Sequence, residues 1–213
     1  NTGWVAIASS RAFGAILRSM APYLDDTGIA APIAHSLTHG YQEEGNTIDT
    51  AFDANAAGCW TVYNTAASSG DDAGWDLGLT NPFQLHTNWY PMSVEWRYQS
   101  GGTLTSGRWW IGCFSSTPMA SDDPAVSGFA FRYATGTDGT AFWRTWSNDG
   151  SGGGTANTTT AAVSSNTAYT FRVDVVSTTE IRFYINGSLV ATHTTNLPAA
   201  TTDLIPYCKV RTL

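Results

Sequence analysis

The alternation of apolar and polar positions is most regular in residues 169–198. One run has the period of two of a half-buried strand, with Tyr169, Phe171, Val173 and Val175 apolar and Thr170, Arg172, Asp174 and Val176 between them. The alternation resumes at 181–185, and Asn186-Gly187 is the pair that best tolerates the two positive φ angles of a type I′ turn. A return run over 189–195 follows. These residues predict a three-stranded antiparallel meander, which needs a second sheet to cover its apolar face.

Shorter apolar or alternating runs follow one another from residue 45 onward. We expect further strands at 47–52, 58–64, 75–79, 83–86, 92–99, 108–115, 129–133, 140–146, 158–163 and 204–211. Loops are expected at 68–74, 117–127 and 148–156, the last being the most flexible because it is rich in Gly and Ser. Strands repeating at intervals of roughly ten residues predict an all-β sandwich or jelly roll. A parallel βαβ fold is excluded, because the connections leave no room for crossover helices.

The first 40 residues have a different pattern. Residues 11–20 carry Phe13, Ile16, Leu17 and Met20 at helical spacing, and Pro22 limits the far end of this predicted helix. A helix of about ten residues is marginal by itself, so it must dock on another surface. We therefore interpret residues 1–40 as an arm or linker and residues 41–213 as the β-sandwich, and we expect the four apolar side chains to form an assembly contact.

Composition and charge narrow the classes of partner. The net charge is −7 without a basic run, which excludes nucleic acid as an expected partner, and no apolar stretch is long enough to span a membrane. No signal-peptide pattern is visible at the start of the sequence. Charged residues make up only 13% of the chain, so Ser, Thr, Asn and Gly must cover much of its surface. Cys113 lies in an apolar run and is expected to be a buried free thiol.

Three segments carry a resemblance to a known family. They are WWIGCFSSTP at 109–118, GFAFRYATGTDGTAFWRTWSNDG at 128–150 and RFYINGSLVATHTTNLP at 182–198. This combination resembles the concanavalin A-like (laminin G-like, lectin/glucanase) jelly roll, and within it the domains of tailed-phage tail fibres, head fibres and capsid-decoration proteins. The resemblance implies two antiparallel sheets over about 170 residues. The same fold class also serves lectins, hydrolases and lyases.

No catalytic set of that fold class is present in the sequence. Its β-glucan hydrolases carry Glu-x-Asp-x-Glu on a central strand, whereas Glu95, the best candidate here, has Arg97 at the position of the partner. Gln84-Leu85-His86 matches the tripeptide of the alginate lyases without their Arg and Tyr motifs. The four histidines form no metal set, and no nucleophile elbow occurs. We expect a protein that is not an enzyme and has no cofactor.

Loop acids near tryptophans are the candidate ligand-binding residues. A Trp ring stacks on a pyranose, and Asp oxygens accept hydrogen bonds from sugar hydroxyls. The candidates are Trp75, Trp110, Trp146, Asp71, Asp72, Asp122 and Asp123. The two acidic pairs are also candidates for calcium, although no ligand spacing in the sequence supports it. Trp143 and Trp146 fall on opposite faces of one strand, as do Trp109 and Trp110, so we expect one ring of each pair in the core and the other to be exposed.

These observations favour a non-enzymatic virion structural protein, displayed on the particle surface as a capsid-decoration or fibre protein of a tailed phage. Its expected partners are other virion proteins, copies of itself and host-surface glycan. A secreted carbohydrate-binding (lectin-like) module is the alternative reading. A polysaccharide lyase or hydrolase with diverged catalytic residues is the weaker alternative.

Overall fold

The computed structural model describes residues 91–100, 104–118, 121–135, 138 and 141–213, together with the backbone of five short strands that precede them. Those five are β1 (Gln42–Glu43), β2 (Phe52–Asp53), β3 (Trp60–Thr61), β4 (Asp72–Asp76) and β5 (Leu85–His86). The longer strands are β6 (Met92–Gln99), β7 (Gly107–Phe114), β8 (Ser127–Ala134), β9 (Phe142–Asp149), β10 (Thr155–Ala162), β11 (Ala168–Ser177), β12 (Glu180–Ile185), β13 (Ser188–His193) and β14 (Asp203–Thr212). The predicted helix at 11–20, with the expected assembly contact of Phe13, Ile16, Leu17 and Met20, lies outside the described residues.

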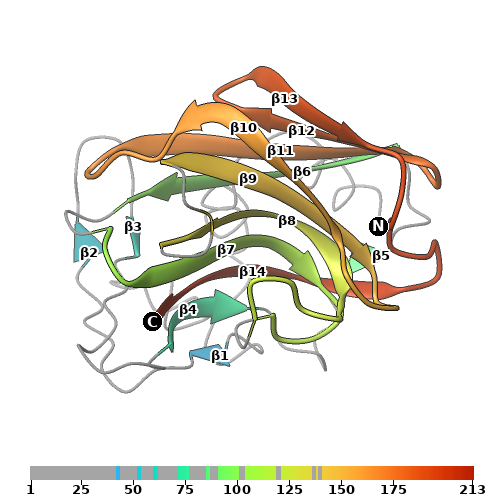
Figure 1. Cartoon of the computed structure of the whole chain (residues 1–213), viewed down its shortest axis with the longest axis horizontal. Helices are drawn as coiled ribbons and strands as arrows, with labels where there is room; N and C mark the ends of the chain where they lie inside the picture. The colour runs from blue at the N-terminus through green and yellow to red at the C-terminus, as the bar shows by residue number, and fades with distance from the viewer. Residues whose placement is uncertain are drawn as a thin grey trace, which may run out of the picture.

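All strands except β2 and β3 form two antiparallel sheets (Figure 1). The larger sheet has the order β1-β4-β14-β7-β8-β9-β10, with β5 also paired to β14, and the smaller sheet has the order β13-β12-β11-β6. Strands β2 and β3 pair only with each other. The described part of the chain is therefore all-β, and the predicted sandwich of two antiparallel sheets is confirmed.

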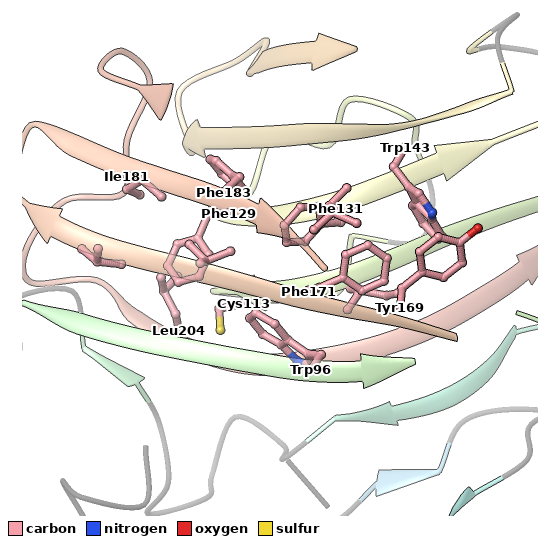
Figure 2. Close-up of a cluster of buried hydrophobic side chains, with 14 of the residues drawn as sticks. Trp96, Cys113, Phe129, Phe131, Trp143, Tyr169, Phe171, Ile181, Phe183 and Leu204 are labelled. Atoms are coloured by element: carbon pink, nitrogen blue, oxygen red, sulfur yellow. The ribbon is translucent and has the colours of Figure 1, made fainter. Parts of the chain in front are cut away.

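The main hydrophobic core lies between the two sheets (Figure 2). The smaller sheet contributes Phe171 and Phe183, and the larger sheet contributes Phe131 and Trp143. The ring centroids of Phe131 and Phe171 are 4.6 Å apart, and those of Trp143 and Phe171 are 4.8 Å apart. Large aromatic side chains from both sheets thus pack against one another in the core and hold the layers together.

The predicted meander is confirmed as β11, β12 and β13. Residues 181, 183 and 185 of β12 are buried, whereas Arg182 and Tyr184 face outward and are only partly buried. Asn186 and Gly187 have φ angles of 51° and 82°, as a type I′ turn requires. The side-chain Oδ1 of Asn186 also accepts a hydrogen bond from the backbone N–H of Thr170 at 2.9 Å, which ties the turn to β11.

A second apolar cluster covers the outer face of the larger sheet. It consists of Trp110, Phe114, Ala130, Trp146, Ile205 and Tyr207, with Val126 from the β7–β8 loop packed against it. Strand β7 is therefore buried on both faces, as its continuous apolar run predicts. The expected exposure of one ring in each tryptophan pair is wrong, because Trp109, Trp110, Trp143 and Trp146 are all buried. The sheet has an apolar layer on both sides.

Three predicted boundaries are corrected by the pairing of the strands. Asp72 was expected in a loop but belongs to β4, where its Cα partner is Arg211 of β14. Strand β9 continues to Asp149, three residues beyond its predicted end, and β10 begins at Thr155, three residues before its predicted start. In each case a neighbouring strand extends the regular structure into a polar part of the sequence.

Candidate functional site

Three loop segments meet at one end of the larger sheet, and Asp123 lies between them. Its Oδ1 accepts two hydrogen bonds, from the indole Nε1 of Trp146 and from the backbone N–H of Gly154, both at 2.9 Å. Trp146 is fully buried in β9, whereas Asp123 is exposed in the β7–β8 loop. A rigid buried ring therefore fixes the orientation of a solvent-accessible carboxylate.

The glycine-rich β9–β10 loop is the second segment. Asn148 connects it to the β7–β8 loop, because Nδ2 donates to the carbonyls of Pro124 and Gly152 while Oδ1 accepts from Gly150 N–H at 2.8 Å. Asp149 Oδ1 accepts from the hydroxyl and backbone N–H of Ser151, and these bonds hold the pKa of Asp149 below its ordinary value. The segment that composition marks as most flexible is thus tied down at several points.

Asn196, in the β13–β14 connection, completes this end of the sandwich. Its Nδ2 donates to Thr155 Oγ1 at 3.2 Å and to the carbonyl of Gly153 at 3.5 Å. Thr155 and Thr195 are also joined through their hydroxyls at 3.1 Å. We call residues 121–126, 149–154 and 194–196 the three-loop end.

The three-loop end presents hydrogen-bond acceptors to solvent. Asp123 Oδ2 has no hydrogen-bond partner among the described residues, and Asn196 and Asp149 are also exposed. A Cβ at Gly153 would lie 3.2 Å from that Oδ2, so the glycine leaves the oxygen accessible. A Cβ at Gly154 would approach Trp146 Nε1 to 2.6 Å, so this glycine is needed for the loop to reach Asp123. Such an arrangement suits the recognition of hydroxyl groups.

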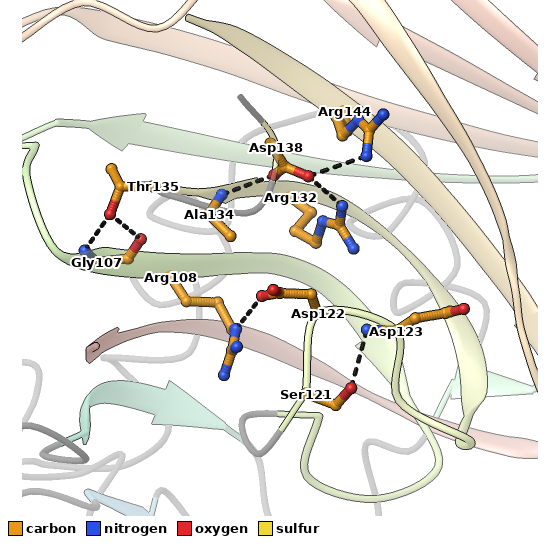
Figure 3. A network of polar contacts seen from close by, with 10 residues as sticks. All are labelled: Gly107, Arg108, Ser121, Asp122, Asp123, Arg132, Ala134, Thr135, Asp138 and Arg144. Atoms are coloured by element: carbon orange, nitrogen blue, oxygen red, sulfur yellow. Dashed lines mark hydrogen bonds and ion pairs between the residues drawn. The ribbon is translucent and has the colours of Figure 1, made fainter. Parts of the chain in front are cut away.

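A buried ion-pair network occupies the outer face of the same sheet (Figure 3). Asp138 accepts from Arg132 and, at 3.0 Å, from Arg144 Nη1, and its second oxygen accepts from Ala134 N–H at 2.8 Å. Arg132 and Asp138 are almost completely buried, whereas 27% of the Arg144 side chain is exposed. The carboxylate is held by strands β8 and β9 together.

Four of the predicted ligand-binding residues come together on this face: Trp110, Trp146, Asp122 and Asp123. The ring centroids of Trp110 and Trp146 are 5.2 Å apart, and Asp122 pairs with Arg108. Because both indole rings have no exposed area, neither offers a free face on which a sugar would stack. Asp123 alone among the four is exposed. Ligand binding through these residues stays a prediction.

The other predicted residues lie away from this group or outside the described structure. Trp75 and Asp72 are in β4, where the Cα partners of their backbones are Cys208 and Arg211. Asp71 is outside the described residues. No group of three or more His, Cys, Asp or Glu that would hold a metal ion occurs in the described part of the chain, so the structure adds no support for calcium.

Sequence reasoning missed Asn148, Asn196 and the two close-packed glycines. The sequence signal was an Asn-Asp-Gly-Ser run directly after a strand, which is typical of side chains that bond to their own turn. Asn196 carried a weaker signal, since Asn tolerates a positive φ better than most residues, and its φ in the structure is 50°. Nothing in the local sequence indicated that the β9–β10 loop and the segment at Asn196 meet.

His193, which the sequence analysis left without a role, is buried between the sheets. Its Nε2 is hydrogen-bonded to Thr145 Oγ1 at 2.9 Å and its Nδ1 to Ser147 Oγ at 2.8 Å. The ring also packs against Phe183, with centroids 4.6 Å apart. Burial lowers its pKa to about 4, so the imidazole is neutral at physiological pH and links β13 to β9.

The carboxylates on the outer face of the smaller sheet are engaged with neighbours. Asp174 accepts from Ser93 Oγ at 2.6 Å and lies 3.2 Å from Arg172 Nε, and Glu180 is 2.5 Å from Arg182 Nε. The Cα partner of Glu95 is Arg172 on the adjacent strand.

No helix among the described residues is long and apolar enough to cross a membrane.

Comparison with known proteins adds one sequence family and several structures. The family described as "SO2946-like, C-terminal domain" matches residues 105–207, which extend from the start of β7 into β14. No curated protein matches the chain. The chain is thus similar to this family over slightly less than half of its length.

Three of the similar structures are a carbohydrate-binding module, a β-glucanase and a galectin. The carbohydrate-binding module CBM66 of Bacillus subtilis is 9% identical, with a TM-score of 0.45 over 81% of this chain and 91% of that one. The β-glucanase of Bacillus licheniformis is 11% identical, with a TM-score of 0.47 over 82% and 80%. Sheep galectin-11 is 12% identical, with a TM-score of 0.41 over 70% and 96%. At these values the likenesses do not bear on function, and the sandwich architecture rests on the strand pairing described above.

Proposed function

We propose that this chain is a non-catalytic carbohydrate-binding domain and that its ligand contacts the three-loop end. The observation that carries the proposal is the geometry of Asp123, whose Oδ1 is held by Trp146 and Gly154 while Oδ2 faces solvent beside Gly153. A sugar offers hydroxyl groups, which donate to a carboxylate oxygen or to an amide oxygen. Asp123 Oδ2 and Asn196 Oδ1 supply such acceptors from separate loops, and the pre-formed loops reduce the ordering cost of binding.

The proposal of binding rather than cleavage is supported by how the acids are used. Glycoside hydrolysis uses two carboxylates on one face, one of which is a nucleophile or base and the other an acid. In the described residues, Asp122, Asp138, Asp174 and Glu180 each pair with an arginine, and Asp123 holds a loop. Carboxylates that pair with arginine or hold a loop are suited to fixing the positions of other groups, which supports binding over cleavage.

A glycan array with the full chain tests the proposal. Wild type is expected to bind a subset of oligosaccharides, and Asp123→Asn is expected to lose about tenfold or more in affinity, because a charged acceptor contributes about 1.5–3 kcal/mol. Gly153→Ala should also weaken binding by crowding Oδ2. The matched control is Asp174→Asn, an acid on the outer face of the smaller sheet, which should bind as wild type does.

Absence of glycan binding by the folded wild-type chain would reject the proposal. Full affinity in a folded Asp123→Asn variant would reject the assignment to the three-loop end. Cleavage products appearing in the array wells or in a reducing-sugar assay would reject the non-catalytic part.

A second proposal is that the domain is displayed on a virion, as a decoration or fibre protein of a tailed phage. It is supported by the uncharged exterior of β10, where Ala156, Asn157, Thr158 and Thr160 are all exposed, since such surfaces are common on virion and secreted proteins. Glycan binding would then serve attachment to a host surface. Density-gradient sedimentation of the native source tests this idea: co-migration with megadalton particles is expected, and a free small protein at the top of the gradient would reject it.

A further inference from the structure

A row of residues crosses the outer face of the larger sheet from β14 to β10. The strand register places Lys209 opposite Trp110, Trp110 opposite Arg132, Arg132 opposite Arg144 and Arg144 opposite Thr158. Residues directly opposite one another in antiparallel strands lie on the same face. This row thus holds three of the ten basic residues of the chain beside one tryptophan, in a protein of net charge −7.

Two neighbouring members of the row have buried N–H groups that make no hydrogen bond. Among the described residues, neither Trp110 Nε1 nor Arg132 Nε has a hydrogen-bond partner, although Trp110 has no exposed area and Arg132 is only 3% exposed. The Cζ of Arg132 lies 5.6 Å from the centre of the Trp110 ring, so the two side chains are neighbours. A buried donor without a partner costs about 1–3 kcal/mol, and more when charged, so such groups call for an acceptor.

The charged side chains next to these donors carry an excess of positive charge, which also favours an anion. The guanidinium groups of Arg132 and Arg144 share the single carboxylate of Asp138, which leaves this triad with one positive charge. Two of its members are buried, and a charge in such surroundings is stabilised strongly by an anion. Arg144 reaches solvent with 27% of its side chain.

The indoles of the inter-sheet core provide a contrast. Trp96 and Trp143 also have buried Nε1 atoms without a partner, but both belong to the apolar cluster between the sheets. The rings within contact distance of Trp143 are Tyr98, Tyr133, Tyr169 and Phe171. The combination of an unpartnered indole N–H, an unpartnered guanidinium N–H and an excess positive charge is therefore found at Trp110 and not at Trp143.

We propose that the Trp110–Arg132–Arg144 row binds the carboxylate of an acidic sugar. Both donor atoms are buried, so the side chains that cover them must move for the carboxylate oxygens to accept from Trp110 Nε1 and Arg132 Nε. The bound charge then neutralises the Arg132–Asp138–Arg144 triad. A planar carboxylate matches the planar guanidinium, which makes arginine the preferred partner for such a group. The anion part of the inference stands on the row alone, and the assignment to a sugar rests on the proposed function.

Calorimetric titration of the full chain with glucuronate, glucose and acetate tests the inference. Glucuronate is expected to bind wild type at least tenfold more tightly than glucose or acetate. Trp110→Phe keeps an aromatic ring and removes the N–H, and Arg132→Lys keeps the charge and removes Nε, so each should weaken glucuronate binding at least fivefold. Trp143→Phe is the matched control for loss of a buried indole and should bind glucuronate as wild type does.

The outcomes separate the two proposals. Equal affinity for acetate and glucuronate would overturn the sugar assignment, whereas no response of wild type to either anion would overturn the whole inference, whatever the variants do. Unchanged glucuronate affinity in folded Trp110→Phe and Arg132→Lys would overturn the location. Asp123→Asn should retain acetate binding, because the asparagine oxygen can still accept from Trp146 Nε1 and so keeps the ring that packs on Trp110 in place. Loss of glycan binding in Asp123→Asn therefore does not bear on the anion site.

Discussion

The indole N–H of Trp146 donates to Oδ1 of Asp123 at 2.9 Å, across 23 positions of sequence. The bond joins the centre of the outer apolar cluster to an exposed loop carboxylate. Gly154 N–H donates to the same oxygen, so the bond also anchors the β9–β10 loop. Both loops depend on one buried ring.

A double-mutant cycle with Trp146→Phe and Asp123→Ala should show that the two residues are energetically coupled. Each single change is expected to lower the free energy of unfolding, and the double change by about 1–2 kcal/mol less than their sum, since the hydrogen bond can be lost only once. Urea denaturation of the four proteins measures this. Additivity to within about 0.5 kcal/mol would contradict the assigned hydrogen bond.

Asp138→Asn should be among the most destabilising single changes in the outer face of the larger sheet. The substitution preserves the shape of the side chain but leaves the guanidinium groups of Arg132 and Arg144 without their shared carboxylate. Breaking a buried ion pair from one side costs about 3–5 kcal/mol, and Asn recovers part of that through its own oxygen, so we expect a loss of about 2–4 kcal/mol in urea.

The control for this change is Asp174→Asn, which breaks the ion pair with Arg172 on the outer face of the smaller sheet. This pair is partly exposed, so its loss should cost no more than about 1 kcal/mol. Equal effects of the two substitutions would show that the Asp138 network is not buried in solution.

His193 should make the protein less stable at mildly acidic pH. Its pKa is about 4 in the folded state, against 6.5 as the ordinary value, because burial disfavours the charged ring. Between these two values the unfolded chain binds more protons, so stability falls as pH drops from about 6.5 to about 4 and is unaffected by this group above 6.5. The groups bonded to the ring, Thr145 and Ser147, carry no charge.

The measurement is the free energy of unfolding, from urea denaturation, of wild type and His193→Gln at pH 7.5 and pH 4.5. Between these two pH values the free energy of unfolding should fall on the order of 2 kcal/mol more in wild type than in the variant, because each pKa unit corresponds to about 1.4 kcal/mol. His86 lies on the short strand β5 and is unchanged in the variant, so its titration cancels in the difference. Parallel pH profiles of the two proteins would show that His193 titrates normally.

Local sequence patterns were enough to predict most of the fold. The alternation in 169–176 and 181–185 and the Asn186-Gly187 turn located β11, β12 and β13, because side-chain period and turn chemistry act over a few residues. The apolar run of β7 likewise indicated a strand buried on both faces. Of the candidate site, the sequence supplied Asp122, Asp123, Trp110 and Trp146 as separate candidates.

Only the tertiary structure decided which of these residues are accessible and what they bind. Trp146 was expected at a ligand surface and is instead buried, because the outer face of the larger sheet carries a second apolar layer. His193 and Ser147 are 46 positions apart and meet because two sheets pack face to face. The sequence by itself determined strands and turns through short-range geometry, whereas burial and polar partners follow from strand register and sheet packing, which depend on the whole chain.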